Sequence, residues 1–297
     1  MNDSPRVFDV SPPLGPAWFR ALTSLAKRGG ATPTVPRLPT VLRPVRADPA
    51  RLAQYRALCG FDASGVLPVT WPQVMAGPLH FHMVTDPSFP LPAAGVVHLH
   101  NLIEQYQPLR DDDLLGFECA LEPAVATHRG FEIDLETRVT REGELVWRSV
   151  ITFLSRRKSG GDKPTPSGRP AAPAAAEAPQ PAPTPLRSTV LRVPENMGRR
   201  YAAIAGDYNP IHQHALAARA FGFPRAIVHG MYTLARTVAE CADDLPPSPF
   251  AVACAFRRPV FLPSTVVLGA ERTADGAVAF SVRSGETVCV DGTIRAL

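Results

Sequence analysis

Alternating apolar and polar residues occur in two stretches, one in each half of the chain. The first, FEIDLETRV at 131–139, is followed by a Gly-Glu turn at 143–144 and the apolar run LVWRSVITFL. The second, AVAFSV at 277–282, leads through another Gly-Glu turn at 285–286 into TVCVDGTIRAL. Alternation into a glycine-containing turn and out again predicts an antiparallel hairpin in each half.

Each hairpin is preceded by a strand-like run, at 96–104 and at 252–256, and further upstream by an aromatic-proline pair. Proline suits the first turn of a helix, so we expect one helix to begin at 71–72 and another to run from 223 to about 241. The second is apolar around most of its surface, which predicts burial. Two copies of a helix followed by antiparallel strands predict an α+β fold, with the copies paired like the subunits of a dimer.

Proline, with 33 residues, is about twice as frequent as the usual ~5%. A Pro/Ala-rich segment at 158–185 lacks bulky apolar residues and has the composition of an extended spacer. It divides the chain into an N-terminal copy, 41–157, and a C-terminal copy, 186–297. Residues 1–40 look like an irregular arm with a short amphipathic helix at 17–27, and we assign them no function.

Charge and cysteine content exclude several classes of protein. Lys and Arg number 31 against 27 acidic residues, a net charge of +4 that is too small for a nucleic-acid-binding surface. The five cysteines are scattered without C-x-x-C spacing, which favours reduced thiols over disulfides or a cysteine zinc site. No signal-peptide pattern and no apolar run of about 18 residues occurs. We expect a cytoplasmic protein without a membrane span.

The residues with the clearest chemistry lie between 201 and 231. A helical stretch stops near Gly206, and the sequence continues as Asp207-Tyr208-Asn209-Pro210-Ile211-His212. A carboxylate and an imidazole on either side of a rigid Asn-Pro turn can face one cavity as an acid/base pair. His229-Gly230-Met231 follows inside the predicted second helix, where Gly230 N–H is a candidate donor to an oxyanion.

Together, GDYNPIH, the following AxxxGF and IVHGM resemble the signature of the MaoC-like, or (R)-specific, enoyl-thioester hydratases and dehydratases, which adopt the hotdog fold. The duplicated layout is similar to the double-hotdog members, whose N-terminal copy has usually lost the catalytic motif while shaping the acyl pocket. The resemblance implies that Asp207 and His212 form the catalytic dyad and that Gly230 N–H binds the thioester oxygen. It also implies that Asn209 positions the turn and the substrate.

The N-terminal copy has no D-x-N-P-x-H motif. Adding 152 to the number of Pro72 gives Pro224, and the same shift places Pro78 opposite Gly230. Proline has no N–H, so in this register the N-terminal copy lacks the oxyanion donor. We therefore expect it to be structural and to shape the substrate pocket.

Other residues could contact the substrate. His229 is a candidate, although a packed, hydrogen-bonded role beneath Gly230 is favoured for it, and His214 is expected to face solvent. Arg225 and the pairs Arg199-Arg200 and Arg257-Arg258 could bind CoA phosphates or an acidic carrier protein. The histidines of His80-x-His82 and His98-x-His100 are expected on strand faces, but no third ligand has a recognisable spacing, so we expect no metal.

The expected activity is the reversible hydration of trans-2-enoyl thioesters to (3R)-3-hydroxyacyl thioesters, without metal or redox cofactor. Acyl-CoA or acyl carrier protein would carry the acyl group. A non-catalytic acyl-thioester-binding protein and, with less support, a hotdog thioesterase are the alternatives. The sequence leaves open a monomer with an internal pseudo-dimer or a homodimer.

Overall fold

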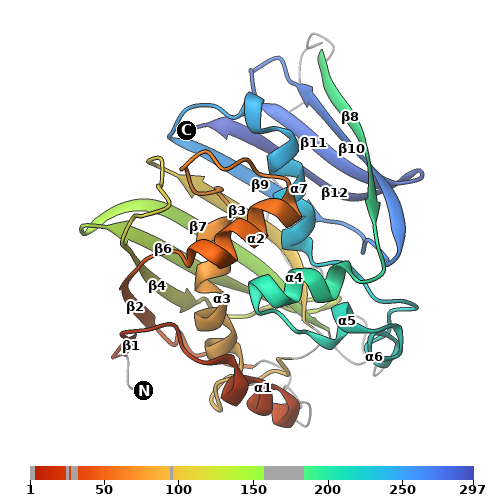
Figure 1. The fold of residues 1–297 in the computed structure, drawn as a ribbon. Helices are drawn as coiled ribbons and strands as arrows, with labels where there is room; N and C mark the ends of the chain where they lie inside the picture. Colours follow the sequence, from red (N-terminus) through yellow and green to blue (C-terminus); the bar gives the residue numbers. More distant parts are fainter. Residues whose placement is uncertain (1–3, 25–26, 28–32, 94–95, 157–183) are drawn as a thin grey trace.

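The computed structural model of the chain (Figure 1) describes residues 4–24, 27, 33–93, 96–156 and 184–297. The elements before the spacer are β1 (Arg6–Phe8), α1 (Leu14–Thr23), β2 (Thr40–Val45), α2 (Pro49–Cys59), α3 (Trp71–Val84), β3 (Val97–Gln105), β4 (Leu115–Leu121), β5 (Val125–Thr127), β6 (Gly130–Arg141) and β7 (Glu144–Arg156). Those after it are β8 (Thr184–Val193), α4 (Met197–Ala205), α5 (Pro210–Gln213), α6 (Ala215–Ala220), α7 (Gly230–Glu240), a 3₁₀ turn (Ala242–Asp244), β9 (Phe250–Phe256), β10 (Ser264–Arg272), β11 (Val278–Ser284) and β12 (Thr287–Ala296).

The described strands form one 12-stranded sheet in which the same topology occurs twice. The order is β2-β4-β6-β7-β3 in the first copy and β8-β10-β11-β12-β9 in the second. In each copy the long helix, α3 or α7, falls between the first two strands in sequence. Antiparallel pairing of β3 with β9, from His100–Ala255 to Gln105–Phe250, joins the copies. The predicted α+β duplication with dimer-like pairing is confirmed.

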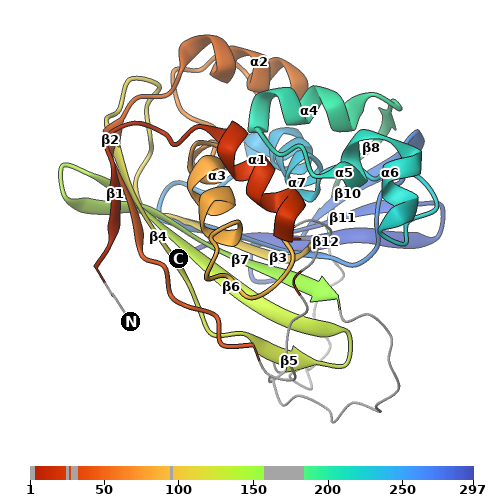
Figure 2. The same cartoon turned by 90° about the horizontal axis from the view of Figure 1, so that it is seen from below.

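The helices cover one face of this sheet (Figure 2), and most buried apolar residues of both copies form one core, with a small second cluster of Ile211, Ala218, Phe223 and Ile227. Trp147 of β7 illustrates how the helical layer is tied to the sheet: its buried indole Nε1–H donates to the carbonyl of Val69 at 2.8 Å. Both predicted hairpins are present as β6–β7 and β11–β12. At the first turn Glu142 and Gly143 have φ of 53° and 86°, a geometry that glycine adopts without a steric cost.

The predicted helix from 223 is wrong in its first turns, because α7 begins only at Gly230. The backbone from Ala226 to Val228 bonds elsewhere: Ile227 N–H donates to Ile211 O at 3.1 Å and Val228 N–H to Val260 O at 2.9 Å. These bonds hold the segment extended between α5 and the loop after β9. His80 and His82 are also misplaced in the prediction, since they lie on α3 and not on a strand.

The later start of α7 gives a second way to match the two long helices, by their first residues, and the match of Pro78 with Gly230 stays a prediction. The first residues of the two long helices are Trp71 and Gly230, whereas Pro78 lies inside α3. Trp71 does have an N–H, but that group donates to the carbonyl of Pro68 at 2.7 Å. With the helices matched at their first residues, the donor of the N-terminal copy is occupied rather than absent.

The N-terminal arm is more regular than its sequence suggests. Its helix, α1, covers Leu14–Thr23 instead of 17–27, and β1 pairs in parallel with β2. Most of the predicted spacer lies outside the described residues, but Thr184 and Pro185 already belong to β8. No helix among the described residues is long and apolar enough to cross a bilayer.

Candidate active site

The turn between α4 and α5 fixes the spacing of the candidate dyad. Gly206 ends α4 in the left-handed region, with φ of 77°. Asn209 then caps α5: its side-chain oxygen accepts from Ile211 N at 3.5 Å, and its own N–H donates to Asp207 Oδ1 at 3.1 Å. Pro210 occupies the first turn of α5, where a missing N–H costs little. Asp207 and His212 are thus held at opposite ends of one capped turn.

His212 is buried with a defined tautomer. Its Nδ1 lies 2.8 Å from the carbonyl oxygen of Ile227. Because a carbonyl can only accept, Nδ1 carries the hydrogen and Nε2 is left as an acceptor. Burial, together with the neighbouring His229, lowers the pKa of His212 to about 3. At neutral pH this imidazole is uncharged.

His229 lies directly beneath the dyad. Its ring stacks on His212 with centroids 3.7 Å apart. Nε2–H donates to the main-chain carbonyl of Asp207 at 2.9 Å, and the Asp207 carboxylate is 3.8 Å away. Burial lowers the pKa of His229 despite that carboxylate. The packed, hydrogen-bonded role considered from sequence describes these contacts, although His229 also lines the cavity described below.

Asp207 faces the cavity, with 53% of its side chain exposed there. Its recessed position alone would raise the pKa of the carboxyl, but the imidazoles of His229 and His212 and the Asn209 N–H outweigh that effect. The net shift of the Asp207 pKa is downward. The site at neutral pH therefore contains an ionised carboxylate beside a neutral imidazole with a bare nitrogen.

Gly230 is the first residue of α7, a position whose N–H has no intrahelical acceptor. A side chain here would force the ring of Phe256 to move, because an added Cβ would lie 2.8 Å from its Cε1. The helix dipole adds partial positive charge at the same end. Gly230 thus offers a backbone donor on the cavity wall, close to the stacked histidines.

These groups line a cavity of about 680 Å³ to which both copies contribute. The apolar lining comes from the arm, with Trp18 and Ala21, and about equally from the two copies, with Val74, Phe81, Val84, Leu135, Ile151 and Phe153 in the N-terminal copy and Ile211, Phe223, Ile227, Val228, Met231 and Phe256 in the C-terminal copy. A second set is basic and consists of His128, Arg129, Arg156, Arg257 and Arg258. A cavity with an apolar side, a basic side and polar groups at the start of a helix suits an amphipathic ligand with an acidic group.

The structure separates the predicted polar candidates. Asp207, Asn209, His212, His229 and Gly230 all line the cavity, whereas Arg225 does not. Arg225 is exposed over the ring of Phe261, 5.4 Å from its centroid, and donates to Pro263 O at 3.4 Å. His214 is exposed and caps α6. Sequence reasoning missed Arg129 and Arg156, whose only signal was their place at the ends of two paired strands.

One group among the described residues has the composition of a metal site, because ligand atoms of Asp207, His212 and His229 lie within 4.8 Å of one another. Two of the imidazole nitrogens, His212 Nδ1 and His229 Nε2, already donate to carbonyls. With the hydrogens on those nitrogens, the unsubstituted nitrogen of His229, Nδ1, is buried and has no hydrogen-bond partner among the described residues. The arrangement fits a water between Asp207 and His212 better than a three-ligand ion.

Comparison with known proteins agrees with this geometry. A family model described as a MaoC like domain matches residues 173–291. Over 253 residues the chain is 36% identical to 3-hydroxyacyl-thioester dehydratase X of Mycobacterium tuberculosis, covering 82% of this chain and 86% of that protein. The chain belongs to the MaoC-like dehydratase family.

Solved structures extend the similarity to the whole MaoC-like fold. The crystal structure of HtdX from M. tuberculosis superposes with a TM-score of 0.74 at 31% identity, covering 87% of this chain and all (100%) of that one. An M. tuberculosis protein described as having a double hotdog fold gives a TM-score of 0.52 at 16% identity, covering 86% and 94% of the two chains. The predicted double-hotdog fold is confirmed for this MaoC-like chain.

Proposed function

We propose that the protein interconverts trans-2-enoyl and (3R)-3-hydroxyacyl thioesters by adding or removing water. The observation that carries the proposal is the convergence of the Asp207 carboxylate and the bare Nε2 of His212 beside the Gly230 N–H, in one cavity. The MaoC-like family membership and the name of the dehydratase relative support the same reaction class.

The two acceptors can orient one water molecule. A water that donates to both Asp207 and His212 presents its lone pair to C3 of the enoyl group. As oxygen bonds to C3, one proton passes to the dyad, and a proton is delivered to C2, so the water is added across the double bond. Negative charge develops meanwhile on the thioester oxygen, where a donor such as Gly230 N–H is worth roughly 3–4 kcal/mol. Dehydration is the reverse.

The basic side of the cavity supports a phosphorylated carrier. Gly130 pairs with Arg156 across β6–β7, and β7, β3 and β9 are neighbours, so Arg129, Arg156 and Arg257-Arg258 come from the same end of the sheet. Arg257 is bound to Asp291 at 2.7 Å. Within the described residues no carboxylate forms an ion pair with Arg156 or Arg258. We infer that they bind the phosphate of the phosphopantetheine arm that CoA and carrier-protein thioesters share.

The setting we propose is a reducing compartment, in keeping with the expected cytoplasm. All five cysteines are free and buried. Burial raises the pKa of all five thiols, to about 12 for Cys59 and Cys119 and to about 11 for Cys241. Thiols of this kind are inert and persist where disulfides are reduced.

The assay supplies crotonyl-CoA in buffer with EDTA and records enoyl absorbance and free thiol separately, with chiral chromatography of the product. Loss of the enoyl signal without thiol, and a (3R) product, is the expected result. Asp207→Asn and His212→Ala should each lower turnover by at least ~10², whereas His214→Ala should not. Thiol release would indicate a thioesterase, and binding without turnover at any chain length a non-catalytic protein.

A further inference from the structure

The N-terminal helix α1 forms part of the wall of the substrate cavity. Trp18 and Ala21, one turn apart on α1, both line it. The Trp18 ring lies 4.3 Å from the ring of Phe81 on α3 and 6.2 Å from that of Tyr208 in the catalytic turn. Trp18 therefore touches both the apolar side of the cavity and the segment that carries Asp207.

The side chain of Leu14, the first residue of α1, packs against the same turn. A Cβ added to Gly206 would lie 2.6 Å from Cδ1 of Leu14, so the two residues are in direct contact. At the other end of the helix, Ser24 Oγ accepts from the N–H of Ala93, a further cavity residue, at 3.0 Å. Contacts at both ends hold the cavity-facing side of α1 in place.

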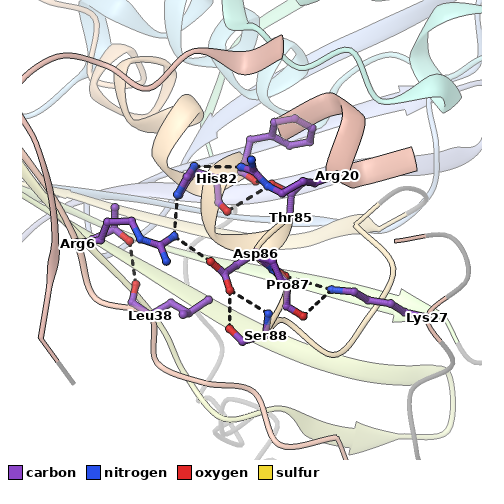
Figure 3. A network of polar contacts seen from close by, with 11 residues as sticks. Arg6, Arg20, Lys27, Leu38, His82, Thr85, Asp86, Pro87 and Ser88 are labelled. Atoms are coloured by element: carbon purple, nitrogen blue, oxygen red, sulfur yellow. Dashed lines mark hydrogen bonds and ion pairs between the residues drawn. The ribbon is translucent and has the colours of Figure 1, made fainter. Parts of the chain in front are cut away.

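A polar network anchors the arm on either side of α1 (Figure 3). Before the helix, Arg6 donates to the carboxylate of the buried Asp86 at 2.8 Å. After it, Lys27 Nζ donates to the carbonyls of Asp86, Pro87 and Phe89. Both anchors therefore converge on the turn that ends α3. An arm bound at two points across its helix resists displacement by a ligand.

The indole of Trp18 contributes mainly bulk. Its Nε1 is buried with no hydrogen-bond partner among the described residues, although a buried tryptophan usually has one. The ring is thus positioned by packing against Phe81 and Tyr208. We propose that α1 limits the size of the acyl group and that Trp18 is the residue that determines the chain length accepted. This inference rests on the proposed acyl-thioester activity.

The experiment measures kcat/KM for trans-2-enoyl-CoAs from four to sixteen carbons, with the full chain. Trp18→Ala should raise the long-to-short ratio of kcat/KM by at least ~10-fold, because one methylene in an apolar pocket is worth 10–200-fold. The ratio for Trp18→Phe should lie between those of the wild type and Trp18→Ala. Ala21→Val adds bulk from the same helix and should lower the ratio. Phe19→Ala is the matched control, since Phe19 is 71% exposed, and should leave the ratio unchanged.

Two outcomes would overturn the inference. One is an unchanged long-to-short ratio of kcat/KM in folded Trp18→Ala and Ala21→Val proteins, and the other is an equal loss of kcat/KM at every chain length. Dissociation constants for saturated acyl-CoAs of the same lengths provide a readout that needs no turnover. A separate outcome is a wild type that hydrates none of the substrates while Trp18→Ala still lowers the dissociation constants of the longer saturated acyl-CoAs relative to the shorter ones. That result would contradict the proposed function but support the role of α1 in limiting acyl-chain length.

Discussion

At the scale of residues, the site depends on which nitrogen of His212 carries the hydrogen. The carbonyl of Ile227 takes Nδ1–H, which directs Nε2 toward the cavity. That carbonyl is available because the segment before α7 is extended and not helical. A helix beginning at 223 would have used its carbonyls internally, so the error in the predicted helix and the tautomer of His212 have one cause.

The protonation states lead to a testable pH dependence. The pKa of His212 is lowered to about 3, and that of Asp207 is also lowered, so both groups stay unprotonated until the pH falls through these values. We expect kcat/KM for crotonyl-CoA at pH 5.5 to remain within about twofold of that at pH 7.5. A histidine with the ordinary pKa of about 6.5 would be only about one-tenth unprotonated at pH 5.5.

The measurement is a pH–rate profile, with circular dichroism at each pH to confirm that the protein stays folded. Activity that declines with a midpoint near 6.5, in protein that is still folded, would show that the imidazole titrates normally. In that case His212 would not be held neutral by its surroundings.

At the scale of elements, the hairpins and α3 could be predicted because their signals are local. Alternation and a Gly-Glu turn specify β6–β7 wherever they occur, and Pro72 marks the first turn of α3. The first strands, β2 and β8, were not predicted. β8 has an exposed edge and begins inside the Pro/Ala-rich segment, so its strand character comes from pairing with β10 and not from its own pattern.

The dyad and Gly230 could be found from sequence because they lie within one short motif. The basic side of the cavity could not, since Arg129 and Arg156 meet Arg257 only through the pairing of strands that are far apart in the chain. Arg225 shows the opposite error: it is near the motif in sequence, yet it packs on Phe261 outside the cavity.

The basic side can be tested with thioesters that differ only in phosphate. Arg156→Ala should raise KM by about tenfold for crotonyl thioesters of phosphopantetheine and CoA, consistent with losing a charge-assisted hydrogen bond. It should leave the KM for crotonyl-pantetheine unchanged. Arg192→Ala, an exposed arginine on β8 away from the cavity, is the control of equal charge.

A larger effect with CoA than with phosphopantetheine would mean that the nucleotide is also recognised. Equal losses for all three thioesters would contradict phosphate binding, because the substitution would then act on the acyl part or on the fold. Comparing the effect of Arg156→Ala on the KM for acyl carrier protein thioesters with its effect on the KM for CoA thioesters distinguishes the two sources of the same phosphate.

At the scale of the whole molecule, the pairing of β3 with β9 gives one chain the contact that two hotdog subunits would otherwise make. The two copies have diverged in chemistry. The C-terminal copy supplies Asp207, His212 and Gly230 and part of the apolar lining, while the N-terminal copy, together with the arm that packs on α3, supplies apolar lining from its own helix and strands. One chain therefore has one site of this kind among its described residues, built from both copies.

The most direct test is a crystal structure of the Asp207→Asn variant with crotonyl-CoA bound. The account predicts the thioester oxygen about 3 Å from Gly230 N, and a water between position 207 and His212 Nε2 that faces C3. The acyl tail should point to Trp18 and the phosphates to Arg156. A thioester oxygen bound away from α7, with no water between the two side chains, would contradict it.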